Sequence, residues 1–244
     1  MTASSRKITA ILFAAAVVAA IAGQLAGIPW LVFLCKPLAT ILLIALALSH
    51  WLARRDPYSL WLTIGLLFSL SGDVALLWPE RYFLAGLAAF LFTHIAYLCA
   101  LTRDAKFPAH APVWLLYLAA GAALCAILWP RLAPPLHFPV ALYSFAITTM
   151  AAQALGRFLL LRTPSSRLAA IGASLFLLSD ALLSLDRFCA PIPLSPLFIL
   201  GTYYAGQWLL VASLSNPPPP PCVYHDFIRP KDDPDSECHN LQSQ

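Results

Sequence analysis

Two aspartates lie deep inside apolar segments of this chain, in nearly the same local sequence. Leu-Phe-Ser-Leu-Ser-Gly leads to Asp73, and Leu-Phe-Leu-Leu-Ser leads to Asp180. Inserting a carboxylate into the hydrocarbon core costs about 2.5–3.5 kcal/mol on insertion scales, so an intramembrane aspartate usually has a function. Two carboxyl groups in one apolar pocket can hold different protonation states and divide into a general acid and a general base. The pair therefore indicates acid–base chemistry within a membrane.

The elements that must position these acids are transmembrane helices. Of the 244 residues, 60% are hydrophobic and 11% are charged, and the mean hydropathy is +0.77. A soluble domain of this length could not cover so much apolar surface. Apolar runs of about 20 residues, enough to cross a bilayer, predict an all-α membrane protein with eight transmembrane helices and short connections. The expected spans are 8–27, 30–52, 58–78, 82–102, 113–129, 138–160, 167–187 and 194–215.

The two similar segments indicate an internal repeat. Asp73 falls in the third expected span and Asp180 in the seventh, so both segments run in the same direction. Spans five to eight are therefore expected to be a parallel duplication of spans one to four, a four-helix unit. The repeat is imperfect, because Lys36 has no basic counterpart in span six and Gly72 has none beside Asp180.

The distribution of cations predicts the orientation of the membrane domain, residues 1–215. Eleven cations fall on one side, namely Arg6, Lys7, Arg54, Arg55, Arg103, Lys106, Arg157, Arg162, Arg167, Arg229 and Lys231. Three fall on the other, namely Arg81, Arg131 and Arg187. Both termini of this multi-pass protein are therefore expected in the cytoplasm. The net charge of +4 reflects this topology, and no nucleic-acid partner is expected. The Ala- and Leu-rich composition and short loops favour a bacterial inner membrane.

The last 29 residues, 216–244, differ in composition from the membrane domain. After Asn216 they have five consecutive prolines, followed by five acidic residues between 226 and 237. Such a segment cannot bury enough apolar surface to order itself. It is predicted to be a disordered cytoplasmic tail.

Helix geometry places several polar residues at similar depths. At about 1.5 Å per residue, Asp73 and Asp180 lie roughly 8–10 Å below the outer membrane boundary. Lys36 and Tyr203 fall in the same layer from two other spans, which predicts a shared cavity in the outer half of the membrane. His94 and Tyr97 lie three residues apart on one helical face. With Gln207, one turn deeper than Tyr203, they form the next layer.

Structural explanations remain open for each of these residues. An intramembrane aspartate or lysine can simply hydrogen-bond a neighbouring span, and Lys36 can reach the membrane interface. His94 can be a satisfied interior histidine, and Tyr203 and Tyr204 can be packing residues. Asp186 and Arg187 stand at the end of a span, where a solvated pair is expected. Ser71 and Ser179 have no adjacent His–Asp arrangement, which leaves a serine hydrolase unsupported.

The order and spacing of these residues resemble the YhhN/TMEM86 family of eight-span membrane proteins, whose characterised members are lysoplasmalogenases. The resemblance covers nearly the whole membrane region and excludes the proline-rich tail. It rests on Lys36-Pro37, Leu70-Ser71-Gly72-Asp73, Leu76-Leu77, Phe83, Gly86, Phe90, His94, Tyr97, Gly172-Ala173-Ser174-Leu175-Phe176, Ser179-Asp180 and Tyr203-Tyr204-Ala205-Gly206-Gln207.

The resemblance implies hydrolysis of the sn-1 vinyl ether of a lysoplasmalogen, giving a fatty aldehyde and glycerophosphoethanolamine or glycerophosphocholine. A vinyl ether is hydrolysed by protonation of its β-carbon, so the reaction needs a carboxylic acid and a negative group to stabilise the resulting cation. Either Asp73 or Asp180 would donate the proton, while the other, ionised and paired with Lys36, would orient water. Lys36 could instead bind the substrate phosphate. His94, Tyr97, Tyr203, Tyr204 and Gln207 would support substrate and water.

Other classes of function compete with this expectation. A proton- or ion-coupled transporter also uses intramembrane Asp and Lys residues, and it would accumulate substrate in sealed vesicles without chemical turnover. A metal-dependent lipid hydrolase is disfavoured because, outside the tail, His50, His110 and His137 lie in or near expected loops and only His94 lies deep within an expected span. A structural lipid-binding protein is a further alternative. Neither a metal nor another cofactor is expected; the expected partners are a lysophospholipid substrate and membrane lipids.

Overall fold

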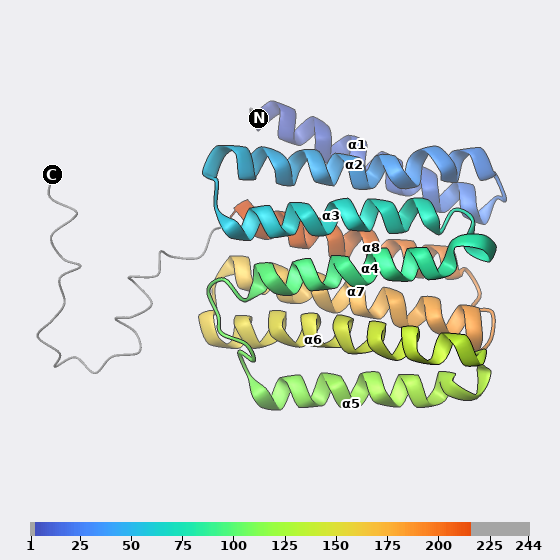
Figure 1. Ribbon diagram of the computed structural model, residues 1–244. Helices are drawn as coiled ribbons and strands as arrows, with labels where there is room; N and C mark the ends of the chain where they lie inside the picture. The colour runs from blue at the N-terminus through green and yellow to red at the C-terminus, as the bar shows by residue number, and fades with distance from the viewer. Residues whose placement is uncertain (1–2, 216–244) are drawn as a thin grey trace, which may run out of the picture.

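The computed structural model describes residues 3–215, and this part of the chain is all-α (Figure 1). Successive helices alternate in direction, and most lie side by side. One end of the bundle, on the left in Figure 1, holds the N-terminus and is called the near end; the opposite end is called the far end. The helices are α1 (Ala3–Leu25), α2 (Pro29–Arg54), α3 (Pro57–Ala75), α4 (Pro79–Leu101), α5 (Ala111–Leu128), α6 (His137–Leu161), α7 (Pro164–Phe188) and α8 (Ser195–Ala212), with short 3-10 turns at Trp129–Arg131, Pro134–Leu136 and Ser213–Ser215. The exception to the side-by-side order is that α4 packs on α6, and α5 lies beyond α6 at the edge of the bundle.

The all-α membrane architecture predicted from the sequence is confirmed. Within the described residues, seven helices are long and apolar enough to cross a membrane. The remaining one, α8, lies among them (Figure 1) but carries Tyr203, Tyr204 and Gln207 on buried positions, which lowers its hydropathy. Eight spans is therefore an approximate count. The predicted tail, 216–244, lies outside the described residues, and the orientation of the bundle stays a prediction.

The two aspartates reach the same depth because their helices begin in the same way. Asp56 caps α3 by accepting a hydrogen bond from the Ser59 amide at 2.9 Å, and Pro57 follows it. Thr163 caps α7 in a capping box, and Pro164 follows it. An N-cap with proline at the first helical position fixes where a helix starts. Asp73 follows Pro57 by 16 residues, and Asp180 follows Pro164 by the same 16.

Helices α3, α4, α7 and α8 form the centre of the bundle, and α5 lies at its edge (Figure 1). The central helices carry much of the buried apolar core, including Leu66, Tyr97 and Phe176. Helix α5 packs chiefly on α6 and has few contacts with α7. Its apolar residues therefore face the bilayer, and the space between α5 and α7 is only partly closed.

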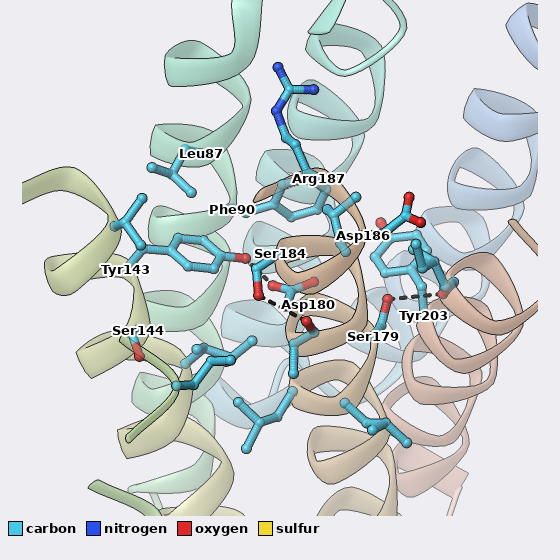
Figure 2. A pocket seen from close by; sticks show the side chains of 18 of the residues that line it. Leu87, Phe90, Tyr143, Ser144, Ser179, Asp180, Ser184, Asp186, Arg187 and Tyr203 are labelled. Atoms are coloured by element: carbon cyan, nitrogen blue, oxygen red, sulfur yellow. Dashed lines mark hydrogen bonds between the residues drawn. The ribbon is translucent and has the colours of Figure 1, made fainter. Parts of the chain in front are cut away.

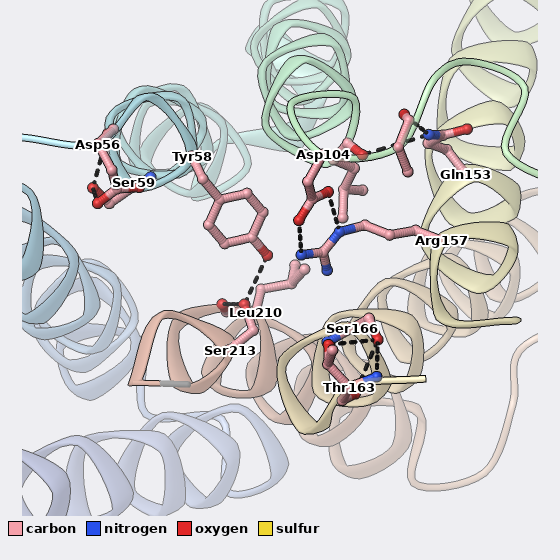
Figure 3. Close-up of polar contacts among 12 residues, drawn as sticks. Asp56, Tyr58, Ser59, Asp104, Gln153, Arg157, Thr163, Ser166, Leu210 and Ser213 are labelled. Atoms are coloured by element: carbon pink, nitrogen blue, oxygen red, sulfur yellow. Dashed lines mark hydrogen bonds and ion pairs between the residues drawn. The ribbon is translucent and has the colours of Figure 1, made fainter. Parts of the chain in front are cut away.

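A buried ion pair closes the near end of the bundle (Figure 3). Arg157 of α6 makes two hydrogen bonds of 2.7 Å to Asp104, which lies in the connection between α4 and α5. Its guanidinium also stacks on Tyr58 of α3, whose hydroxyl hydrogen-bonds Ser213 at 2.8 Å. Gln153 holds the same connection by accepting from the Ala109 amide at 2.9 Å. Arg157, counted from the sequence among the cations on the cytoplasmic side, is thus a buried structural residue.

Helices α7 and α8 approach closely at Gly172 and Gly206. A Cβ atom on Gly206 would lie 2.7 Å from the Gly172 carbonyl oxygen and 3.0 Å from the Phe176 amide nitrogen. Small residues at such positions let membrane helices pack backbone to backbone. This contact fixes the helix that carries Asp180 against the helix that carries Tyr203.

We expect Gly206→Ala to lower the free energy of unfolding by about 1–3 kcal/mol, because overpacking forces the two helices apart. The thermal unfolding midpoint in detergent measures this effect. Gly201→Ala in the same helix is the matched control, since a Cβ there meets no atom within 4 Å. Equal midpoints for the two variants would contradict the close-contact role of Gly206.

Candidate active site

A cavity of about 860 Å³ lies in the far half of the bundle, and residues from all eight described helices line it. Its volume falls within the range of small-molecule sites, about 300–1,000 Å³. Most of its lining is apolar, with Leu and Phe side chains prominent. Lys36, Asp73, Asp180 and Tyr203, placed in one layer from the sequence, all line it. The four residues that the sequence places at one depth therefore line one cavity.

Asp73 is surrounded by hydrogen-bond donors and a cation. Its Oδ2 accepts hydrogen bonds from the Thr40 hydroxyl at 2.6 Å and the Tyr203 hydroxyl at 2.9 Å. The Lys36 ammonium lies 3.4 Å from Oδ1, and the Asp73 side chain is 1% exposed. A carboxylate accepts and does not donate, and an opposite charge favours it. These contacts favour the ionised form of Asp73, and its burial opposes that form.

A chain of polar contacts continues from Asp73 behind the cavity wall. The Tyr203 hydroxyl also meets Ser69 Oγ at 2.7 Å, and the Gln207 amide donates to the same Ser69 oxygen at 2.6 Å. The Tyr97 hydroxyl then donates to Gln207 Oε1 at 2.6 Å. Tyr97 and Gln207 do not line the cavity. They position the Tyr203 hydroxyl through Ser69 and Gln207, and they do not contact the cavity themselves.

Tyr204 has a different role from Tyr203. Its hydroxyl donates to the backbone carbonyl oxygen of Lys36 at 2.8 Å, and its ring is buried. It does not line the cavity. Tyr204 therefore fixes α8 against α2 at the level where Lys36 enters the site.

Asp180 belongs to a second polar cluster (Figure 2). The Tyr143 hydroxyl of α6 donates to its Oδ2, and His94 Nε2 of α4 lies 3.8 Å from the same oxygen. Tyr143 and His94 also meet each other at 3.0 Å. The Asp180 side chain is 15% exposed, more than that of Asp73. Within the described residues, no cation of Lys or Arg lies within ion-pair distance of Asp180.

Aromatic rings separate the two clusters. Phe176 packs edge-on against His94 at 4.9 Å and against Tyr203 at 5.2 Å between ring centroids. Phe90 packs edge-on against Tyr203 at 6.0 Å. The acids therefore share a cavity but not a hydrogen-bond network. One is paired with a cation, and the other contacts the Tyr143 hydroxyl and lies near the His94 imidazole.

The contacts of the two acids follow the same pattern, as expected of a duplicated unit. Asp73 on α3 meets α2 through Lys36 and α8 through Tyr203. Asp180 on α7 meets α6 through Tyr143 and α4 through His94. Each acid thus contacts the preceding helix of its own half and the last helix of the other half. Tyr143 takes the place in α6 that Lys36 takes in α2.

Three contacting residues were missing from the predicted site: Thr40, Ser69 and Tyr143. Thr40 lies four residues after Lys36, and Ser69 lies four residues before Asp73, so each shares a helical face with a predicted residue. That spacing was a usable signal. Tyr143 also had a signal, because it precedes Asp180 by 37 residues and Lys36 precedes Asp73 by the same 37, but Tyr143 is not basic.

Comparison with known proteins assigns the chain to a family. The model of the YhhN family matches residues 31–214, which include both aspartates and every predicted site residue. The chain belongs to the YhhN family. It is 32% identical to lysoplasmalogenase TMEM86A of Bos taurus over 183 residues, covering 73% of this chain and 75% of the relative. It is 34% identical to lysoplasmalogenase TMEM86B of Rattus norvegicus over 185 residues, covering 75% and 72%.

A bacterial protein of the same family is also similar. The membrane protein YhhN of Escherichia coli O157:H7 is 28% identical over 190 residues, covering 77% of this chain and 89% of that protein. No solved structure matches this chain. Together with the apolar helices, these relatives show a multi-pass integral membrane protein of the YhhN family.

Proposed function

We propose that this protein hydrolyses the sn-1 vinyl ether of a lysoplasmalogen, releasing a fatty aldehyde and a glycerophosphoethanolamine or glycerophosphocholine. The observation that carries the proposal is Asp180, a carboxyl group facing an apolar cavity without a pairing Lys or Arg among the described residues, while Asp73 in the same cavity is paired with Lys36. The names of the mammalian relatives support the same substrate class.

The difference between the two acids supports a division of roles. Asp73 receives two hydroxyl hydrogen bonds and the Lys36 charge, so we assign it as the ionised member. Asp180 is then the proton donor. The negative charge of Asp73 and the dipoles around it stabilise positive charge that develops elsewhere in the cavity. Tyr143 and His94 hold the Asp180 carboxyl toward the substrate.

The chemistry proceeds by proton transfer to carbon. The Asp180 carboxyl gives its proton to the β-carbon of the vinyl ether, and the ether oxygen shares its lone pair to form an oxocarbenium ion. Water adds to the α-carbon and loses a proton to the Asp180 carboxylate. The hemiacetal then transfers its hydroxyl proton to the glycerol oxygen as that carbon–oxygen bond breaks. One water is consumed, and Asp180 ends protonated as it began.

The shape of the cavity supports a lipid substrate. Leu116 of α5 and Leu178 of α7 line it, and both side chains are exposed. Between these two helices the hydroxyls of Tyr117 and Ser174 meet at 3.2 Å. Because α5 makes few other contacts with α7, we infer that the cavity opens sideways toward the bilayer between these two helices. An alkenyl chain can lie in this gap while the polar part of the lipid lies in the cavity.

We expect purified protein in detergent to release fatty aldehyde from lysoplasmenylcholine or lysoplasmenylethanolamine, and not from the matching 1-alkyl lysolipid. The saturated ether has no double bond to protonate, so it is the control for chemistry. In ²H₂O, borohydride trapping should give an alcohol with one deuterium on carbon 2, the former β-carbon. The same measurement on an Asp73→Asn/Asp180→Asn protein sets the background.

Two results would contradict the proposal. Folded protein that releases no aldehyde from either vinyl ether is not this hydrolase, and uptake into sealed vesicles would then test transport. Aldehyde that forms without deuterium on carbon 2 would exclude protonation of the β-carbon.

A further inference from the structure

Arg187, in the last turn of α7, lines the far end of the cavity, although its position at the end of a span suggested a solvated residue. The carboxylate of the neighbouring Asp186 is directed to the backbone, because its Oδ1 accepts a hydrogen bond from the Ile192 amide at 2.6 Å. The Arg187 guanidinium stacks on the ring of Phe83 at 4.6 Å. Figure 2 shows Arg187 and Asp180 on the same helix, with the guanidinium extending away from the acid. Arg187 is thus a positioned cation at the far end of the cavity.

The charge of Arg187 is available to a ligand, whereas that of Lys36 is not. The residues that line the cavity include one lysine, Lys36, and one arginine, Arg187. Lys36 is 11% exposed and lies 3.4 Å from Asp73. Arg187 is 30% exposed, and its acidic neighbour Glu80 lies 4.0 Å away and is 93% exposed. An exposed pair of that kind contributes little, so an anion entering the cavity meets Arg187 as an open partner.

The spacing between Arg187 and Asp180 matches that of a lysophospholipid. They are seven residues apart on α7, two helical turns, which is about 10 Å along the axis and nearly the same face. Seven covalent bonds separate the phosphorus atom from the β-carbon of the sn-1 vinyl ether, about 8–9 Å in an extended chain. With the vinyl ether against Asp180, the phosphate therefore reaches the level of Arg187.

We propose that Arg187 binds the phosphate of the lysolipid and sets the position of the vinyl ether at Asp180. This inference rests on the proposed function and names the part of the substrate that this residue recognises. A planar guanidinium matches phosphate oxygens with two parallel hydrogen bonds. Stacking on Phe83 holds the guanidinium plane, which reduces the freedom lost when phosphate binds. Lys36 is then left to its pairing with Asp73.

The test compares substrates with and without phosphate. For Arg187→Gln, we expect kcat/KM for lysoplasmenylethanolamine to fall about 10- to 100-fold, the size of a charge-assisted contact. The value for 1-alkenylglycerol, which lacks the phosphate, should stay within about twofold of that of the native protein. Arg187→Lys should recover part of the loss. Arg81→Gln is the matched control, because Arg81 lies at the same end, stacks on Tyr82 and does not line the cavity.

An equal loss for both substrates would overturn the proposal, since it would show that Arg187 serves the helix end or the fold. A binding measurement distinguishes failure of this proposal from failure of the proposed hydrolase activity. The saturated 1-alkyl lysophosphoethanolamine and 1-alkylglycerol can be titrated into native protein and Arg187→Gln by native mass spectrometry. Weaker binding of the phosphate-bearing lipid alone supports the Arg187 site even if no aldehyde forms. Unchanged binding of both lipids overturns it.

Discussion

Asp180→Asn is expected to reduce aldehyde release about 1,000-fold, within the range of 10²–10⁴ that a positioned general acid contributes. An amide cannot give a proton to carbon, whereas its oxygen can still accept the hydrogen bond from Tyr143. The substitution therefore removes the chemistry and keeps the contact. The measurement is the initial rate of aldehyde formation from lysoplasmenylethanolamine, with the thermal unfolding midpoint recorded on the same sample.

Asp56→Asn is the matched control for that experiment. Asp56 lies at the near end of the bundle and caps α3, and asparagine caps a helix about as well as aspartate. The control loses a carboxylate without touching the cavity, so it should keep native activity and stability. An Asp180→Asn protein within about tenfold of the native rate would exclude Asp180 as the proton donor.

The fold was predictable from sequence because hydropathy and proline positions determine it locally. Apolar runs gave the spans, and Pro29, Pro57 and Pro164 stand at the first helical positions that the structure shows. Depth was also predictable, since the rise per residue in a helix is constant. That constancy is why Lys36 and Tyr203 could be placed at the level of Asp73 before any packing was known.

Partner choice was less predictable, because it depends on how each helix is rotated against its neighbours. His94 and Tyr97 are three residues apart and were expected to serve one layer with Gln207. Three residues turn a helix by about 300°, so the two side chains point about 60° apart. In the structure this difference sends Tyr97 to Gln207 on α8 and His94 to Tyr143 on α6. Helix rotation is a property of the whole bundle, and local sequence does not contain it.

The pairing of Lys36 with Asp73 gives the second large expected effect, on stability. Lys36→Met alone leaves the buried Asp73 without its cation, and Asp73→Asn alone leaves the buried ammonium without its anion. Removing one partner of a buried pair costs about 3–5 kcal/mol, because the other charge stays unpaired in an apolar environment. Each single variant should therefore unfold at a clearly lower temperature than the native protein.

The double variant Lys36→Met/Asp73→Asn separates the structural role of the pair from its chemical role. With both charges gone, Thr40 and Tyr203 can still hydrogen-bond the amide oxygen of residue 73, so most of the stability should return. Activity should not return, because the negative charge that stabilises the oxocarbenium ion is still missing. A double variant that regains both stability and turnover would show that the pair only holds α2 to α3, and Asp180 would then act without a second carboxylate.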